Sequence, residues 1–202
     1  MKTVIATGNK NKVREMRQIL GDISDNVISM EEAGIDCEII ENGDTFLKNA
    51  LIKARTVKEH WDGMVVADDS GLVIDALGGD PGVMSSRYLG EDTPYEEKNK
   101  ALLKRLEGIE AKRRTARFVC AMAAILPNGE EICVEEKMEG IIADAPAGEN
   151  GFGYDPIFFL PEEGCTSAEL SAEAKNAISH RGKATRDLRR RLDEYRERKG
   201  KA

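Results

Sequence analysis

Two adjacent aspartates, Asp68 and Asp69, carry the strongest chemical signal in the sequence. They follow the apolar run Met64–Val66 and stand directly before Ser70 and Gly71, where we expect the chain to turn. Burying an unpaired charge is costly, so acids are rare inside strands. A carboxylate pair at the end of a strand suits a divalent cation, which takes oxygen ligands. A solvated acidic turn is the alternative interpretation.

A polar loop follows the first apolar segment, residues 2–6. Small and polar side chains let backbone N–H groups face an anion, and the N-terminus of a following helix favours negative charge. The pattern predicts phosphate binding, with a plain connecting loop as the alternative, because no Gly-x-x-x-x-Gly-Lys-Ser/Thr motif occurs. The residues concerned are Thr7, Gly8, Asn9, Lys10, Asn11 and Lys12.

A helix is expected over residues 44–61. It contains another lysine, Lys53, and a third acid, Glu41, lies in the segment before it. Glu41 precedes that helix and is either a further metal ligand or a loop acid. Lys53 lies seven residues after Phe46, so both share one helix face. A lysine on a largely apolar face either extends its amine to solvent or faces a pocket.

The segment Gly151–Pro156 combines glycines, aromatic rings and an acid. Its glycines allow the backbone to approach a flat ligand closely, while Phe152 offers a stacking face. Asp155 precedes a proline, which holds it extended, so its carboxylate can accept from a ring N–H. An ordinary turn with Phe152 packed into the core is the alternative.

His180 and Arg181 stand at the expected junction of the last two helices, with Lys175 upstream. Imidazole and guanidinium together offer several hydrogen-bond donors in a restricted geometry. A cationic cap on a helix C-terminus is an equally good interpretation of the pair.

The elements that must position these residues alternate between helical and strand patterns. This predicts an α/β (or α+β) fold with a mixed sheet, in a single domain over residues 1–202. Thr93 is expected to cap a helix opening at Pro94, and Asp44 or Thr45 the helix before it. Residues 127–130 predict a hairpin. Further helices are expected at 12–20, 169–178 and 183–197, and strands at 2–6, 115–126, 131–138 and 157–160.

Composition narrows the class of protein. The 202 residues are 41% hydrophobic and 33% charged, as in a globular domain, and the net charge of −7 argues against a nucleic-acid partner. The four cysteines form no Cys-x-x-Cys pair, which favours a reduced compartment over a zinc site. No apolar run approaches the length of a membrane span or a signal peptide. We therefore expect a cytoplasmic protein without a membrane partner.

Together, these segments closely resemble the non-canonical purine nucleoside triphosphate pyrophosphatases, the inosine triphosphate pyrophosphatase family. Met84 departs from the family pattern, which usually has an aromatic residue there. The matching segments span nearly the whole chain and are Ala6–Asn9, Ala67–Leu72, Gly79–Val83, Ser86–Tyr88, Gly151–Pro156 and Ser179–Gly182.

The resemblance implies hydrolysis of inosine, deoxyinosine and xanthosine triphosphates (ITP, dITP and XTP) to the monophosphate and pyrophosphate. It also implies Mg²⁺, a homodimer, and an elongated mixed sheet flanked by helices, with two lobes and a central substrate cleft. Asp69 would be the general base and would surround the metal with Glu41 and Asp68. Phosphates would be held by Thr7 to Lys12, Lys53, Ser70 and Lys175. The base would be held by Phe152, Gly153, Tyr154, Asp155, His180 and Arg181.

Hydrogen-bond sign suggests how such a site selects its base. Hypoxanthine and xanthine carry an acceptor oxygen at position 6, where adenine carries a donor, so donors such as His180 and Arg181 would reject adenine. Guanine would be rejected at its 2-amino group by Asp155 or nearby backbone. A nucleotide-binding sensor without turnover, and a pyrophosphatase acting on modified pyrimidine nucleotides, remain as competing hypotheses.

Overall fold

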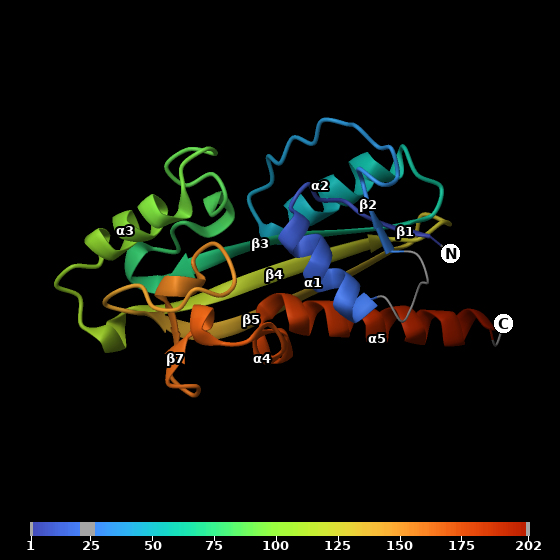
Figure 1. Cartoon of the computed structure of the whole chain (residues 1–202). Coiled ribbons are helices and arrows are strands. Elements are labelled where there is room, and N and C mark those ends of the chain that lie inside the picture. The colour runs from blue at the N-terminus through green and yellow to red at the C-terminus, as the bar shows by residue number, and fades with distance from the viewer. Residues whose placement is uncertain (1, 21–26, 201–202) are drawn as a thin grey trace. The chain divides into compact units, whose positions relative to one another are not determined.

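A computed structural model describes residues 2–20 and 27–200, so the single domain expected over residues 1–202 extends beyond the described residues (Figure 1). Five α-helices lie in the described part of the chain. They are α1 (Lys10–Leu20), α2 (Phe46–Lys58), α3 (Tyr95–Arg105), α4 (Ala172–Ile178) and α5 (His180–Gly200).

The strands of the described residues form one seven-stranded sheet in the order β2-β1-β3-β4-β5-β6-β7. β1 pairs in parallel with β2 and β3, whereas β6 pairs antiparallel with β5 and β7. The predicted mixed sheet with helices is therefore confirmed. The strands are β1 (Thr3–Ile5), β2 (Val27–Ser29), β3 (Met64–Ile74), β4 (Thr115–Ile125), β5 (Glu131–Ile142), β6 (Phe158–Leu160) and β7 (Cys165–Thr166).

The chain divides into two compact units. Unit 1 comprises Met1–Asp69, Cys120–Glu136 and Arg181–Ala202, and unit 2 comprises Ser70–Val119 and Lys137–His180. The divisions fall inside β3, β4 and β5, so each of these strands contributes residues to both units.

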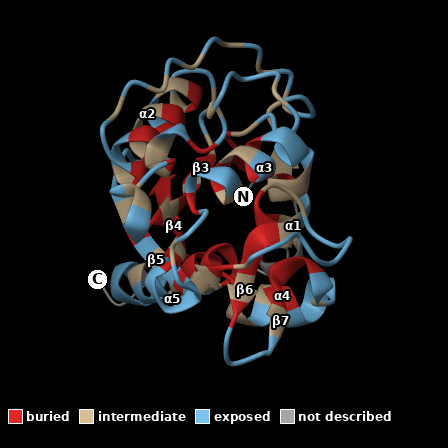
Figure 2. Cartoon of the chain, turned by 90° about the vertical axis from the view of Figure 1, so that its left-hand side faces the viewer, coloured by how far each residue is buried: buried red, intermediate tan, exposed pale blue. Residues whose placement is uncertain are grey.

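Unit 1 has a hydrophobic cluster on each face of its strands, because successive strand side chains point to opposite faces. Met64 and Val66 of β3 pack with residues of α1 and α5. Val65 and Ala67 pack on the other face with residues of α2. Figure 1 shows α2 on one side of these strands and α1 and α5 on the other, and Figure 2 shows how fully β3 is buried. Alternation along β3 thus decides which helix each side chain meets.

Unit 2 has a single large cluster around aromatic and leucine side chains. The rings of Phe118 on β4 and Phe158 on β6 lie 4.4 Å apart between centroids. Leu102 of α3 and Leu106 at its end are fully buried in the same cluster. This packing holds α3 against the strands of unit 2.

The largest correction to the predicted elements concerns the acidic pair. β3 continues without interruption from Met64 to Ile74, so Asp68 and Asp69 lie inside a strand and Ser70-Gly71 is not a turn. A strand interior tolerates acids when each carboxylate has a cationic or hydrogen-bonding partner, and both have them here.

Other boundaries moved for local reasons. Thr93 does not cap α3, because its hydroxyl donates to the carbonyl of Leu89 and Pro94 takes the cap position. Thr45, one of the two expected caps, does cap α2 through the Lys48 N–H. The short strands β2 and β7 were not predicted. Among the described residues, no helix combines the length and the apolar character needed to cross a membrane.

Candidate active site

The two neighbouring acids of β3 meet different helices, because neighbouring strand residues point to opposite faces. Asp68 contacts Lys12 of α1 and Arg181 of α5. Asp69 contacts Asn49 and Lys53, both on α2. The pair therefore belongs to two electrostatic environments within unit 1.

Asp68 is a buried, doubly paired carboxylate. Its Oδ2 lies 2.9 Å from Lys12 Nζ and accepts a hydrogen bond from Arg181 Nε at 3.3 Å. Burial raises the pKa of Asp68, but the charges of Lys12 and Arg181 outweigh it and hold that pKa well below its usual range. Arg181 also donates to Glu15 at 2.7 Å. Asp68 is thus a fixed anion that ties β3 to α1 and α5.

Asp69 has the opposite electrostatic character. Its Oδ2 accepts from Asn49 Nδ2 at 3.1 Å, and its Oδ1 accepts from Lys53 Nζ at 3.3 Å. Burial raises the pKa of Asp69 above its ordinary value, and Lys53 and Lys12 oppose that rise only in part. A carboxylate with a raised pKa is better suited than Asp68 to accept a proton from water.

Lys53 joins Asp69 to Glu41. Its ammonium lies 2.6 Å from Glu41 Oε2, and the side chain is almost fully buried. Burial lowers the pKa of Lys53, but the three neighbouring carboxylates outweigh it and raise that pKa, so the amine stays charged. Lys53 therefore does not extend its amine to solvent; it directs the amine to Glu41 and Asp69.

Asn49 is a site residue that the sequence reasoning missed. It is fully buried on α2, one helical turn before Lys53, where apolar residues predominate. Its Oδ1 accepts from the Gly43 N–H at 2.8 Å while its amide donates to Asp69. A Cβ at Gly43 would lie 2.7 Å from that oxygen, so this close approach requires glycine. A polar residue within the apolar stripe of α2 was the signal that could have revealed it.

Two of the three acids predicted to surround a magnesium ion lie where they could bind it together. Mg²⁺ in phosphate-transfer sites is commonly held by one or two carboxylates together with substrate phosphates. Glu41 and Asp69, which both contact Lys53, fit that description, whereas Asp68 lies on the other face of β3 with Lys12. Within the described residues, no three Asp, Glu, His or Cys side chains are grouped so that they could hold a metal ion.

The polar loop before α1 is organised by its own side chains. Asn9 Oδ1 accepts from the N–H groups of Asn11 and Lys12, and so caps α1. Thr7 Oγ1 accepts from the Asn9 N–H. Gly8, Asn9 and Lys10 are exposed, while Lys12 is directed to Asp68. The exposed part of the loop can accept an anion, and its role with phosphate stays a prediction.

In unit 2, the Asp155 carboxylate stabilises the glycine-rich turn by hydrogen bonds to the turn and to neighbouring residues. Its Oδ2 accepts from the Phe152 N–H at 2.8 Å and from Lys175 Nζ at 2.5 Å, and its Oδ1 accepts from Ser167 Oγ at 2.9 Å. A Cβ at Gly151 would lie 2.3 Å from Asp155 Oδ2, and the backbone there has φ +76°, so both sterics and conformation require glycine. Asp155 therefore shapes the turn through internal bonds.

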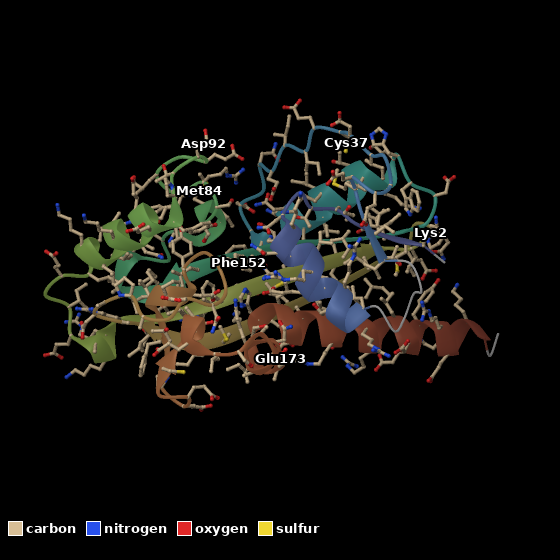
Figure 3. The ribbon with its side chains drawn as sticks, in the orientation of Figure 1. Lys2, Cys37, Met84, Asp92, Phe152 and Glu173 are labelled. Atoms are coloured by element: carbon tan, nitrogen blue, oxygen red, sulfur yellow. The ribbon has the colours of Figure 1, made fainter. Side chains whose placement is uncertain are left out.

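Phe152 is the half-buried aromatic of this turn, and it is labelled in Figure 3. Lys175 Nζ lies 5.0 Å from its ring centroid, which places the lysine expected at the phosphates beside the turn expected to hold the base. Tyr154 is buried, and burial raises the pKa of its phenol, whose hydroxyl donates to the carbonyl of Ser85 at 2.7 Å. Met84, where the family pattern differs, is 48% exposed and so is not a core residue.

His180 and Arg181 open α5, while Ser179 takes the C-cap position of α4. The His180 imidazole stacks on Phe118 in unit 2, with 4.9 Å between centroids and 15° between planes. Arg181 belongs to unit 1, where it contacts Asp68. The adjacent residues His180 and Arg181 thus have separate partners.

Ser70, predicted to hold phosphate, is half-buried and follows Asp69 on β3.

The fold and the site define an α/β protein with a buried, lysine-bridged carboxylate centre in one unit and a glycine-rich aromatic turn in the other. Comparison with known families agrees with this description. The Ham1 family model matches residues 3–191, and the chain belongs to this family.

Relatives of known name cover the chain almost completely. A dITP/XTP pyrophosphatase of Bacillus subtilis is 47% identical over 190 residues, which is 94% of this chain and 96% of the relative. A dITP/XTP pyrophosphatase of Clostridium perfringens is 42% identical over 197 residues, covering 95% and 97%. The solved structure of a HAM1 protein from Coxiella burnetii superposes with a TM-score of 0.87 at 41% identity, covering 96% of this chain and 99% of that one.

Proposed function

We propose that this protein hydrolyses non-canonical purine nucleoside triphosphates, namely ITP, dITP and XTP, to the monophosphate and pyrophosphate. The observation that carries the proposal is the Glu41–Lys53–Asp69 cluster, in which the buried Asp69 carboxylate, with its raised pKa, lies beside a charged and buried lysine. The names of the relatives, dITP/XTP pyrophosphatase, support the same substrate class.

Asp69 is the proposed general base. Hydrolysis of a phosphoanhydride requires a positioned water and stabilisation of charge rather than a covalent intermediate. Asn49 and Lys53 orient the Asp69 carboxylate, which then takes a proton from the water that attacks the α-phosphorus. Mg²⁺, held by Glu41 and Asp69 together with the substrate, would offset negative charge on the phosphates.

The phosphates are assigned to residues of the loop before α1, with Lys53 and Ser70. Lys12 contributes through a fixed position, because Asp68 holds its ammonium 2.9 Å away. This contact gives Asp68 a role in orienting a phosphate-binding lysine, in addition to its predicted place near the metal. Backbone N–H groups and lysines are the chemistry that polyphosphate chains require.

The base is assigned to the Gly151–Asp155 turn and His180. Donors directed at the 6-oxo group would accept hypoxanthine and xanthine and reject adenine. Asp155 already accepts three hydrogen bonds, so rejection of the guanine 2-amino group falls more readily to the backbone of the turn. Lys175 and Arg181 are still predicted to contact the substrate. The Lys175 ammonium would then bind both the substrate and Asp155, and the Arg181 guanidinium both the substrate and Asp68.

A panel of nucleoside triphosphates with detection of released pyrophosphate tests the proposal. ITP, dITP and XTP should be hydrolysed with Mg²⁺ far faster than ATP, GTP and the pyrimidine triphosphates. Binding of ITP without turnover would support the sensor hypothesis instead. A preference for modified pyrimidine nucleotides would support a pyrophosphatase of that specificity.

Two further parts of the proposal come from the family resemblance and the cysteines. We expect a homodimer in solution, which light scattering would show as a doubled mass. All four cysteines are free thiols, in keeping with a reducing, cytoplasmic location.

A further inference from the structure

Helix α3 contacts the Gly151–Asp155 turn of unit 2 through side chains that make none of the Asp155 carboxylate bonds. Asn99 Nδ2 on α3 donates to the carbonyl of Gly153 at 3.2 Å. Asn99 is only 5% exposed, although amide side chains normally lie at the surface. No sequence pattern indicated a role for Asn99, which lies 54 residues before Gly153 in the chain.

The orientation of the Asn99 amide follows from chemistry. Two carbonyl oxygens cannot hydrogen-bond to each other, so the NH₂ group must face Gly153. Among the described residues, the Oδ1 of Asn99 has no hydrogen-bond partner, which makes the Gly153 bond the directional contact of this buried amide. The Gly153 carbonyl supplies the hydrogen-bond partner that the buried NH₂ group of Asn99 needs.

Tyr95, one helical turn before Asn99, makes the second contact. Its ring packs edge-on against Tyr154, with 5.1 Å between centroids and 89° between planes. A Cβ on Gly153 would lie 3.6 Å from the Tyr95 ring, so the ring also covers the glycine itself. Tyr95 and Asn99 thus meet consecutive residues of the turn.

A third contact joins α3 and the turn to one segment. Tyr154 donates its hydroxyl to the carbonyl of Ser85 at 2.7 Å. Lys98 Nζ donates to the carbonyl of Ser86 at 2.6 Å and lies over the Tyr95 ring. Because both α3 and the turn are bound to this segment, a shift of the turn would have to break several contacts together.

We propose that Asn99 is a positioning residue for base selection, because it fixes the Gly153 peptide and with it the backbone groups that the turn presents to the base. The inference rests on the proposed function, which assigns the base to this turn. A fixed backbone makes a wrong hydrogen-bond pattern costly, whereas a turn that can shift accommodates it. Asn99 therefore acts on selectivity and on substrate affinity, and not on the acid cluster of unit 1.

The test compares Asn99→Leu with the wild type, using pyrophosphate release from ITP and from GTP. Loss of one positioning hydrogen bond should raise KM for ITP and lower the ITP-to-GTP ratio of kcat/KM by about 3- to 10-fold, with kcat for ITP changed less than about threefold. Tyr95→Leu, at a partly exposed position, should lower the ratio in the same direction and decides the matter if Asn99→Leu does not fold.

Leu102→Val is the matched control, since Leu102 is buried on α3 in the core of unit 2 and does not belong to the three contacts above. It should lower the thermal midpoint while keeping the selectivity ratio. An unchanged ratio in folded Asn99→Leu and Tyr95→Leu would overturn the inference, as would an equal loss in Leu102→Val. A wild type that shows no preference for ITP would instead overturn the proposed function, and the inference with it.

Discussion

At the scale of single residues, the acids of β3 differ because their neighbours differ. Asp68 is surrounded by Lys12 and Arg181, which hold its carboxyl ionised. Asp69 has Lys53 on one side and a neutral amide, Asn49, on the other, and burial outweighs these contacts. One acid is therefore suited to a structural role and the other to proton transfer.

Asp69→Asn removes the proposed base and keeps the size of the side chain. We expect turnover of ITP to fall by about 10²- to 10⁴-fold, the usual contribution of a positioned base. Pyrophosphate release measures the loss, and circular dichroism should show an unchanged fold. Turnover near the wild-type rate in a folded variant would exclude Asp69 as the base.

Asp68→Asn removes the counter-charge of half-buried Lys12 and one of the two carboxylates that contact buried Arg181. Breaking a buried pair by removing one partner destabilises by about 3–5 kcal/mol, so the free energy of unfolding should fall by that order. Urea titration at neutral pH measures it. A loss as small as that of a surface residue would contradict the structural role of Asp68.

The same pair predicts a pH dependence with a defined sign. The pKa of folded Asp68 lies below the unfolded value of about 3.9, so its contribution to stability is present above that pH and is lost as the pH falls towards the folded pKa. The stability difference between wild type and Asp68→Asn should therefore shrink on acidification below about pH 4. Unfolding curves for both proteins from neutral to acidic pH test this, and a gap that widens would contradict it.

At the scale of elements, α2 carries two side chains of the proposed active site, Asn49 and Lys53, and depends on its first turn. Thr45 caps the helix by accepting from the Lys48 N–H. The neighbouring Asp44 makes an exposed ion pair with Lys48 instead. The position of Asn49 and Lys53 along β3 follows from where this helix begins.

Thr45→Ala should therefore lower the free energy of unfolding by about 1 kcal/mol, the usual effect of losing a side-chain cap. Asp44→Ala is the control, since exposed ion pairs contribute little. Denaturant titration of both variants decides between the two caps. A larger loss in Asp44→Ala would show that the aspartate, and not the threonine, stabilises the first turn.

At the scale of the whole molecule, metal dependence should appear only with substrate. The described residues offer two carboxylates in contact with Lys53 and no group of three ligands, so we expect substrate phosphates and water to complete the coordination. EDTA should abolish pyrophosphate release and added Mg²⁺ should restore it. Mg²⁺ alone should leave the thermal midpoint almost unchanged, whereas full activity in EDTA would exclude the metal.

The sequence alone indicated most of the local elements and the family. Helical spacing predicted α1 and α2, cap residues predicted α3, and turn residues predicted the β4–β5 hairpin, because these signals depend on near neighbours. The motifs around Asp69, Phe152 and His180 were sufficient to suggest the family, which the comparisons confirmed.

Only the tertiary structure decided which partners the two acids have. The sequence suggested a turn at Ser70-Gly71, and only the continuous strand places Asp68 and Asp69 on opposite faces. Their partners come from distant segments, with Arg181 lying 113 residues after Asp68. The charge of a buried carboxyl depends on what surrounds it in space, so no local pattern could have separated the fixed anion from the proposed base.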